Sequence, residues 1–460
     1  MSIDTDYLIV GGGAAGLAFA DALLRETDAT IAIVDERGRP GGHWNDAYRF
    51  VRLHQPSAYY GVNSTPLGRD AIDTFGPNAG FCELATGAEV CAYFEHVMEQ
   101  VLLPTGRVQY FPMCRFEGDG RLVSLLTGAA HEVRIRKKTV NTAYAAGTVP
   151  SRHKPGYSIA PHVRHVPVNH LANLDSPTKG YVIVGAGKTG MDACLWLLDR
   201  GVDPEAICWI MPQDAWLLDR ALTQPDGKFF EAAVGGLAAQ MEAAAEAKSI
   251  ADLFLRLEAA GTLLRLDPSV MPTAYRCATV NQSELRQLRR IRNVVRLGRV
   301  KAIEPDRIVL DRGEIATGGD VLHVDCSAKG VAPRPRRPIF EGRQITLQFV
   351  RTCQPAFSAA LIAYIEAHYE DEAKKNQLCG VVQSPERDID WLRMTIANAL
   401  NAFNWSQEPG LRQWLLKSRL NGFSGLLKPG EELTPEQRAI RQRMRSAAPG
   451  AIANLQRLLA

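Results

Sequence analysis

The sequence predicts an α/β fold built from two similar units, and three observations support this prediction. A short apolar strand followed by a glycine turn and a helix occurs twice, at Gly11-x-Gly13-x-x-Gly16 and at Gly185-x-Gly187-x-x-Gly190. At 460 residues the chain exceeds the size of one ordinary hydrophobic core. Apolar runs at residues 139–147 and 320–326 are typical of a strand that closes a parallel sheet. We therefore expect two Rossmann-like dinucleotide-binding domains, the second inserted in the first, with helical insertions.

The first glycine turn has the surroundings of a dinucleotide site. Its glycines allow the backbone to approach a pyrophosphate, and the helix that follows offers free N–H groups to the charge. A second apolar strand, residues 31–34, ends at Asp35, where a carboxylate accepts hydrogen bonds from ribose hydroxyls. The alternative is an ordinary strand-to-helix turn followed by a surface acid. The candidate cofactor-binding residues of this unit are Gly11, Gly13, Ala14, Ala15, Gly16, Asp35 and Glu36.

The second glycine turn predicts a second dinucleotide in the same chain. It follows the apolar strand 181–184 and precedes a helix, as the first turn does. A purely structural turn is a stronger alternative here than at the first turn. The candidate residues are Gly185, Gly187, Lys188, Thr189 and Gly190.

Composition excludes several other classes of protein. The formal net charge of +3 comes from 53 basic and 50 acidic residues spread along the chain, which is not the pattern of a nucleic-acid-binding protein. The N-terminus is acidic and opens directly into a strand, so we expect no signal peptide. Apolar runs are too short to span a membrane. These features predict a soluble cytoplasmic protein.

The nine cysteines are scattered and never spaced Cys-x-x-Cys. This spacing argues against the dithiol chemistry of disulfide reductases and against zinc knuckles, so most of the cysteines are expected to be small buried apolar residues. His162, His165 and His170 cluster between the glycine turns without matching thiolates or carboxylates. We therefore expect no metal site.

The order of patterns along the chain predicts three segments. Residues 1–150 form the N-terminal part of the first domain, 178–330 form the second domain with a helical insertion at 229–264, and 331–460 return to the first domain and add a helical C-terminal part. A connector at 150–177, rich in proline and histidine, is expected to break regular structure. Helices are expected at 89–102 and 358–366, and a C-terminal helix opens with a capping box at Thr434 and Gln437.

Residues beyond the first turn carry a resemblance to a known group. Gly41-Gly42-His43-Trp44, which follows Arg37 and Pro40, looks like the N-terminal signature of FAD-binding flavoproteins with two dinucleotide domains. Tyr48-x-x-x-Arg52 and Ser57-x-Tyr59 then resemble class B flavoprotein monooxygenases, which include the Baeyer–Villiger enzymes. The resemblance implies FAD in the first domain, near Gly42, His43 and Trp44, and NAD(P)H in the second. It also implies that the N-terminus of helix 358–366 faces the flavin ring.

The same resemblance implies roles for five further residues. Arg220 matches an arginine that stabilises the peroxyflavin anion, a task suited to a fixed guanidinium, although a surface or phosphate-pairing role is equally open. His54 and Arg52 would set the charge and hydrogen bonding near the ring, with a structural role as the alternative for His54. Gln55 and Ser57 would be polar contacts in the same pocket.

The chain also departs from this group at several positions. Pro212 and Gln213 stand where an arginine and a hydroxyl residue usually hold a 2′-phosphate, so that phosphate would need Lys188 or Arg220 instead. His54 replaces an aspartate with a group that titrates near neutrality. Of the histidine-containing fingerprint before the second turn, only His165 is present. The chain is thus a divergent relative, and the choice between NADH and NADPH stays open.

The leading hypothesis is an FAD-dependent oxidoreductase, specifically an NAD(P)H-dependent flavin monooxygenase that acts on a small organic substrate with molecular oxygen. One alternative is a flavoprotein oxidase or dehydrogenase with a vestigial nicotinamide site. Another is a non-catalytic dinucleotide-binding module that senses redox state. The substrate, the oligomeric state and the role of the C-terminal part stay open at this point.

Overall fold

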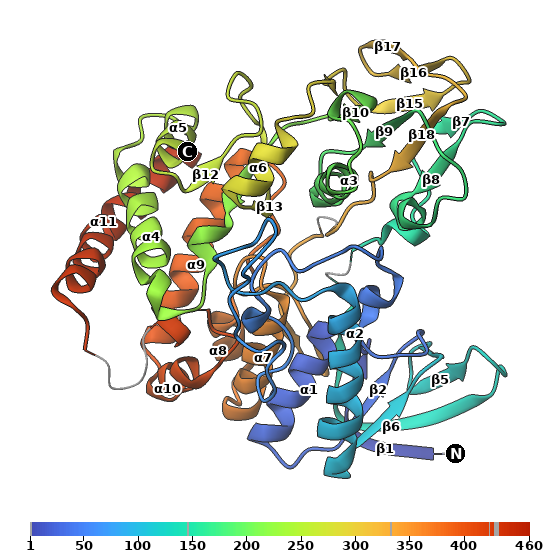
Figure 1. Cartoon of the computed structure of the whole chain (residues 1–460). Helices are drawn as coiled ribbons and strands as arrows, with labels where there is room; N and C mark the ends of the chain where they lie inside the picture. Colours follow the sequence, from blue (N-terminus) through green and yellow to red (C-terminus); the bar gives the residue numbers. More distant parts are fainter. Residues whose placement is uncertain (1, 145–146, 332–333, 423, 427–431) are drawn as a thin grey trace.

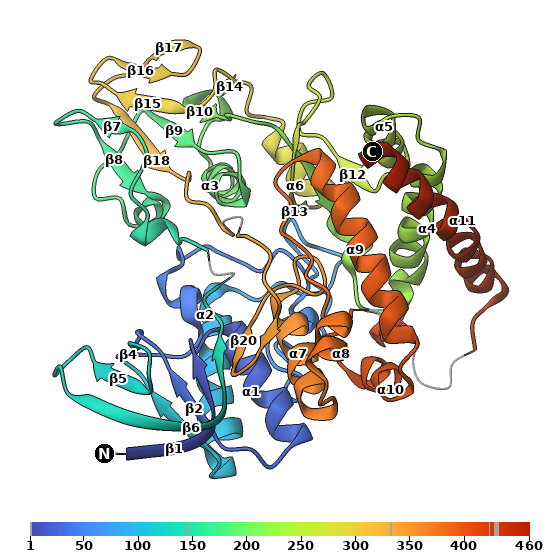
Figure 2. The same ribbon diagram turned by 180° about the vertical axis from the view of Figure 1, so that it is seen from behind.

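The computed structural model describes residues 2–144, 147–331, 334–422, 424–426 and 432–460. The expected closing run 139–147 falls partly on residues 145 and 146, which lie outside the described part. Two main sheets, one mixed and one parallel, two smaller sheets and a helical region make up the described part of the molecule (Figures 1 and 2).

The first sheet is built from both ends of the chain. Its strands lie in the order β19-β20-β6-β1-β2-β3, with β1 parallel to both β2 and β6, and the β4–β5 hairpin extends it from β6. Because β20 follows the inserted unit and pairs with β6, the predicted insertion of the second domain in the first is confirmed. The bounds are β1 Ser2–Val10, β2 Ile31–Val34, β3 Val108–Phe111, β4 Cys114–Phe116, β5 Arg121–Ser124, β6 Ala130–Asn141, β19 Phe340–Glu341 and β20 Gln344–Thr346.

Helices α1 (Ala14–Glu26) and α7 (Pro355–His368) pack against each other beside this sheet (Figures 1 and 2). Every residue of α7 from Ala356 to Glu366 is buried, as expected of a helix that is apolar on all sides. The helix expected at 89–102 is present as α2 (Gly87–His96), which continues into a π-helical turn, Val97–Leu102.

The second sheet is wholly parallel, with strands in the order β14-β10-β9-β18-β8. Helix α3 (Lys188–Asp199) follows β9. A small sheet of β15, β16, β17 and β7 packs against strands β9 and β10 of the second sheet. The bounds are β7 Ser158–Ile159, β8 His165–Pro167, β9 Gly180–Val184, β10 Ile207–Ile210, β14 Val294–Val295, β15 Val300–Ile303, β16 Arg307–Leu310, β17 Gly313–Ala316 and β18 Val321–Asp325.

The connector 150–177 is more regular than predicted. Its strands β7 and β8 pair with β15 and β18, so the expectation that prolines would break regular structure was wrong here. Both strands are short and lie at sheet edges, where proline is tolerated because no ladder hydrogen bond is lost on the free side. Sheet pairing of the second unit therefore begins at Ser158, and the domain boundaries given above stay predictions.

A helical region joins the insertion of the second unit to the C-terminal part. Helix α11 packs along α4, and α9 packs against α11 and β13 (Figure 2). The single helical insertion predicted at 229–264 is interrupted at residues 247–249 and ends in a strand, and the capping box at Thr434 is confirmed. The bounds are α4 Phe230–Glu246, α5 Ile250–Ala259, α6 Gln282–Leu288, α8 Glu372–Leu378, α9 Asp388–Ser406, α10 Pro409–Lys417, α11 Pro435–Leu459, β11 Ala215–Asp219, β12 Leu263–Leu264 and β13 Ala274–Val280.

No helix among the described residues is long and apolar enough to cross a membrane. Within the same residues, no group of three or more histidine, cysteine, aspartate or glutamate side chains is arranged to hold a metal ion.

Candidate dinucleotide sites and the contact between them

The first glycine turn is shaped by close backbone approaches. Gly11 has a left-handed φ of 112°, and a side chain at Gly16 would overlap the carbonyl oxygen of Gly11. A Cβ at Gly42 would lie 2.9 Å from the Cα of Gly13, so the Gly41–Gly42 pair and the first turn touch each other. No side chain caps α1 at Gly13, and its first N–H groups, including those of Ala14 and Ala15, lack intrahelical partners. This arrangement fits an anion at the helix N-terminus.

Asp35 lies directly behind this turn and is only 6% exposed. Its carboxylate accepts hydrogen bonds from the N–H groups of Gly12 (2.6 Å) and Arg37 (2.7 Å). Each oxygen keeps a further lone pair, so Asp35 can still accept a ribose hydroxyl. The neighbouring Tyr110 hydroxyl is buried and has no hydrogen-bond partner among the described residues. Glu36, in contrast, points outward and pairs with Arg115 at 3.0 Å.

The second glycine turn repeats this geometry on the second sheet. Gly185 has a φ of 133°, and a side chain at Gly190 would overlap the Gly185 carbonyl oxygen, which already accepts a hydrogen bond from Trp209 Nε1 (2.8 Å). Gly187 caps α3 with no side-chain hydrogen bond, and the space above its Cα is open. Thr189 is partly buried in the first turn of α3. The second turn therefore also offers a free helix N-terminus to an anion.

A segment of the first unit packs directly on helix α3. Tyr48 donates a hydrogen bond to Asp192 (2.7 Å), and the same carboxylate pairs with Lys188. The ring of Phe50 stacks on Trp196, with centroids 5.0 Å apart. Lys188 is therefore held by an intrahelical ion pair, and the side chains of both partners are largely buried.

His54 lies where the two units meet. Burial lowers the pKa of its imidazole well below 6.5, the nearby charges of Lys188 and Arg220 act in the same direction, and Glu284 opposes them. The imidazole is therefore neutral at physiological pH. The expectation that this residue would titrate near neutrality was wrong, because burial in this contact was not visible in the sequence.

Arg220 is almost completely buried, with 1% of its surface exposed. Its Nε donates to the carbonyl oxygen of His54 (3.0 Å), Nη1 donates to Asn78 (3.2 Å), and Nη2 pairs with Glu284 (2.8 Å). Glu284 also forms the capping box of α6 with Asn281. The guanidinium thus joins three separate segments of the chain.

The three other residues predicted near the flavin ring, Arg52, Gln55 and Ser57, differ from one another in exposure and in hydrogen bonding. Arg52 is exposed, and its guanidinium reaches the Leu84 carbonyl oxygen at 3.4 Å. The buried Ser57 hydroxyl donates to the Glu83 carbonyl (3.1 Å) and accepts from the Ala85 N–H (2.8 Å). Both of its partners are backbone groups of the protein. Gln55 is partly buried beside His54.

The aromatic pair after the glycines lies close to the first turn. Trp44 donates to the Tyr60 hydroxyl (2.7 Å), and the His43 ring stacks against Trp44 with centroids 5.4 Å apart. The His43 side chain keeps accessible surface, yet the protein packed around it lowers the pKa of its imidazole; Arg37 adds to this effect, and Asp46 opposes it.

Arg276 is a residue that the sequence reasoning did not identify. It donates a hydrogen bond to Gln213 (3.1 Å), which follows β10 at the carboxyl end of the second sheet. Its side chain keeps accessible surface, yet the surrounding chain lowers the pKa of the guanidinium, Arg299 adds to this, and Glu386 opposes it. No local sequence motif identifies Arg276, because it lies 63 positions after its partner Gln213.

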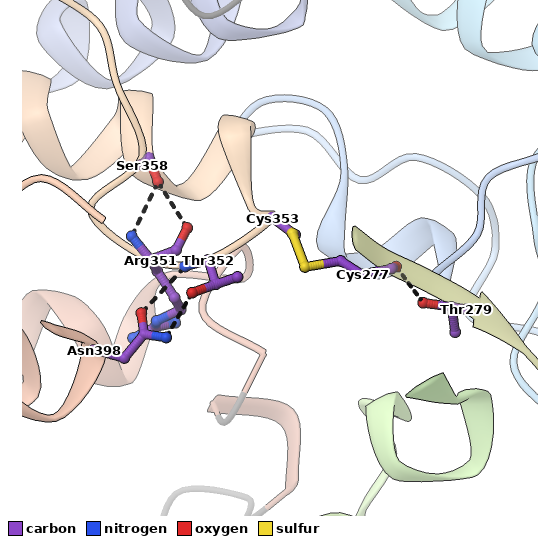
Figure 3. The surroundings of a disulfide bond; sticks show 7 residues. All are labelled: Cys277, Thr279, Arg351, Thr352, Cys353, Ser358 and Asn398. Atoms are coloured by element: carbon purple, nitrogen blue, oxygen red, sulfur yellow. Dashed lines mark hydrogen bonds between the residues drawn. A yellow bond between two sulfur atoms is a disulfide. The ribbon is translucent and has the colours of Figure 1, made fainter. Parts of the chain in front are cut away.

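Two cysteines also depart from expectation. Cys277 and Cys353 form a disulfide across 76 positions of sequence (Figure 3). This pair has no Cys-x-x-Cys spacing, and only the fold brings the two residues together. The other cysteines are free, and most of them are buried as predicted.

These features define an α/β protein with two Rossmann-like sheets, each with a glycine turn at a free helix N-terminus. Residues 9–63 match the family model of the NAD(P)-binding Rossmann-like domain, which confirms the predicted dinucleotide-binding fold for the first turn.

The chain belongs to the family of the mycobacterial proteins named Uncharacterized protein Rv2000, from Mycobacterium tuberculosis, and Uncharacterized protein Mb2023, from Mycobacterium bovis. It is 50% identical to each over 428 residues, which cover 93% of this chain and 79% of the relative.

Solved structures with a similar arrangement include two monooxygenases and a reductase. A steroid monooxygenase bound to NADP aligns over 98% of this chain and 99% of its own, with 13% identity and a TM-score of 0.46. The polycyclic ketone monooxygenase of Thermothelomyces thermophila aligns over 97% and 89%, with 12% identity and a TM-score of 0.49. The bacillithiol disulfide reductase of Staphylococcus aureus aligns over 78% and 97%, with 12% identity and a TM-score of 0.46. Similarity of this degree carries no information about the reaction.

Proposed function

We propose that this protein is a flavin-dependent oxidoreductase that holds FAD on the first glycine turn and NAD(P)H on the second. More specifically, we propose a monooxygenase that acts on a small organic substrate with molecular oxygen in the cytoplasm. The observation that carries the proposal is the contact between the two units. The backbone carbonyl of His54, in the first unit, accepts a hydrogen bond from Arg220 of the inserted unit (3.0 Å), and the charge of Lys188 on the second glycine turn acts on the His54 imidazole.

The residues of the first turn suit FAD. A side chain at Gly16 or Gly42 would clash with neighbouring backbone, the N-terminus of α1 is uncapped, and Asp35 keeps acceptor capacity for a ribose. FAD, when bound, supplies the redox chemistry between a nicotinamide and the substrate or oxygen. The protein's own contribution is binding, orientation and electrostatics.

In this proposal the contact at His54 orients groups in the site and does not add a positive charge to it. A neutral imidazole can donate one hydrogen bond and accept another, but it does not supply a cation. Arg220 acts as a positioning residue, because it holds the backbone of His54 while its charge is matched by Glu284. Tyr48 and Asp192 hold Lys188 at the entry to α3 in the same way.

The structure suggests a different residue for a 2′-phosphate. Lys188 and Arg220, the two sequence candidates, are each engaged in an ion pair. Arg276 lies beside Gln213 at the end of β10, where the ribose of a dinucleotide is held in this fold, and Arg299 is close enough to affect its pKa. We propose that Arg276 meets the 2′-phosphate if NADPH is the donor.

The ion pairs of Lys188 and Arg220 favour the oxidase or dehydrogenase alternative, because they leave neither side chain free for a nicotinamide cofactor. If the second turn holds neither NADH nor NADPH, the protein is a flavoprotein oxidase or dehydrogenase that takes electrons directly from its substrate.

An absorbance experiment tests the proposal. Purified protein should show a bound-flavin spectrum, and anaerobic NADH or NADPH should bleach it, with recovery when oxygen is admitted. A flavin spectrum that persists with both nucleotides but is bleached by a substrate alone would support the oxidase alternative. Purified protein without flavin that also fails to bind added FAD would contradict the whole proposal.

A further inference from the structure

We propose that Cys277 and Cys353 form a reversible dithiol–disulfide couple, a redox site that ties the inserted unit to the first unit. The proposal is independent of the flavin chemistry above. Cys277 lies on β13 of the inserted unit, and Cys353 lies between β20 and α7 of the first unit (Figure 3).

The backbone of β13 is distorted at Cys277. Trp216 of β11 pairs with Tyr275, but the next pair along the ladder is Leu218 with Thr279, so β13 carries extra residues at this point. Bulges of this kind redirect a side chain out of the regular alternation of a strand. Here the redirected side chain is the one that reaches Cys353.

Both cysteines adopt the left-handed backbone region, with φ of 56° at Cys277 and 54° at Cys353. Among the described residues only six other than glycine have positive φ, and two of them are the partners in this bond. Cysteine is not a residue that favours this region, and such conformations concentrate at functional sites.

The segment that carries Cys353 is held without help from the disulfide. Asn401 donates to the Val350 carbonyl (2.7 Å), and Asn398 contacts Thr352 through both its oxygen and its nitrogen. The Ser358 hydroxyl accepts from the N–H of Val350 (3.2 Å) and from that of Arg351 (3.4 Å), and Figure 3 shows the second of these bonds. Opening of the bond therefore leaves Cys353 in place and releases β13 from it.

The two cysteine residues differ in exposure. Cys277 is 9% exposed, whereas Cys353 keeps more accessible surface. We therefore assign Cys353 as the cysteine that an external thiol attacks. Cys353 also lies two residues before α7, whose N-terminus has no side-chain cap, and a helix N-terminus stabilises a nearby thiolate, which favours reaction of reduced Cys353 with an external disulfide.

The reductant we assign is a low-molecular-weight thiol. Its thiolate attacks Cys353 Sγ, the Cys353–Cys277 bond breaks, and Cys277 leaves as a thiolate that takes a proton from water. A second thiolate then attacks the external sulfur of the mixed disulfide, which releases Cys353 as a thiolate and forms the oxidised external disulfide. Two external thiolates each lose one electron, and the protein disulfide gains both.

Counting of reactive thiols in the full-length protein tests this couple. Purified native protein is alkylated with iodoacetamide before and after dithiothreitol treatment without denaturant, and the labelled cysteines are identified by mass spectrometry. We expect Cys277 and Cys353 to be protected before treatment, labelled after it, and protected again after glutathione disulfide is added. Hydrogen exchange of residues 274–280 should also rise on reduction, while that of residues 350–354 should not.

Single variants test the assigned order of attack. With Cys277→Ser, glutathione disulfide should leave one mixed disulfide on Cys353, whereas with Cys353→Ser it should leave Cys277 unmodified. Cys91→Ser, which removes a partly exposed free cysteine, is the matched control and should behave as the parent protein.

Two results would overturn the proposal. One is labelling of both cysteines in untreated protein that persists after oxidation by glutathione disulfide. The other is a disulfide that dithiothreitol reduces only in denaturant, because such a bond would be structural. Both are measured on the unmodified protein, so a variant that fails to fold does not prevent the test.

Discussion

Arg220 Nε donates a hydrogen bond to the carbonyl oxygen of His54, 3.0 Å away, so a side chain of the inserted unit fixes the backbone of the first unit. The two residues are far apart in sequence and were both candidates for the reaction centre. The structure brings them together through the main chain of His54 and leaves its imidazole neutral. This contact is the basis of the first two predictions.

Arg220→Ala should destabilise the protein by about 3–5 kcal/mol, because it leaves the Glu284 carboxylate buried without its partner. The measurement is thermal unfolding followed by circular dichroism. Arg220→Ala/Glu284→Gln should recover part of the loss, since no unpaired charge remains. Equal stability of the single variant and the parent would show that the ion pair is not structural. If the double variant folds and binds flavin, loss of coupling between nicotinamide consumption and product would support the positioning role.

The stability of the folded protein should depend on the protonation of His54. Its folded-state pKa lies well below 6.5, so the unfolded chain binds a proton first as the pH falls. Stability is then lost below about pH 6.5, by at most about 1.4 kcal/mol per pH unit from this group. His54→Asn should make the denaturation midpoint less sensitive to pH between 5 and 7. Other histidines, among them His43, have lowered pKa values too, so His43→Asn is the matched comparison. An unchanged pH profile in the His54 variant would contradict a neutral buried imidazole.

Asp35→Ala should weaken FAD retention, because it removes the carboxylate that orders the first glycine turn and that would accept ribose hydroxyls in the proposed site. The measurement is the ratio of flavin to protein absorbance after dialysis, together with flavin titration of the stripped protein. Glu36→Ala is the control, since Glu36 lies outside the turn and pairs with Arg115. A variant at Asp35 that retains flavin as well as the control does would remove this residue from the site.

Arg276→Ala should raise the KM for NADPH by roughly tenfold or more and leave that for NADH nearly unchanged, because one charge-assisted contact to a phosphate is worth about 1.5–3 kcal/mol. The measurement is steady-state flavin reduction with each nucleotide. Arg299→Ala removes a neighbouring exposed arginine and should have a smaller effect, because the hydrogen bond to Gln213 comes from Arg276. A parallel change for both nucleotides would assign Arg276 to the fold rather than to the phosphate.

The sequence by itself determined the parts of this protein whose cause is local. Glycine spacing after an apolar strand requires a tight turn into a helix, so both turns and the helices α1 and α3 were predictable. The capping box at Thr434 and the acid at Asp35 follow from the same short-range chemistry. The insertion of the second unit was readable because each unit ends in its own closing strand.

Only the tertiary structure decided the features that depend on distant partners. The pairing of Arg220 with Glu284, the low pKa of His54 and the disulfide between Cys277 and Cys353 each join segments that no local pattern connects. Strands β7 and β8 of the proline-rich connector likewise depend on distant partners, because they form by pairing with β15 and β18. Charge, pKa and covalent pairing depend on which groups are buried together, and burial is a property of the packed fold.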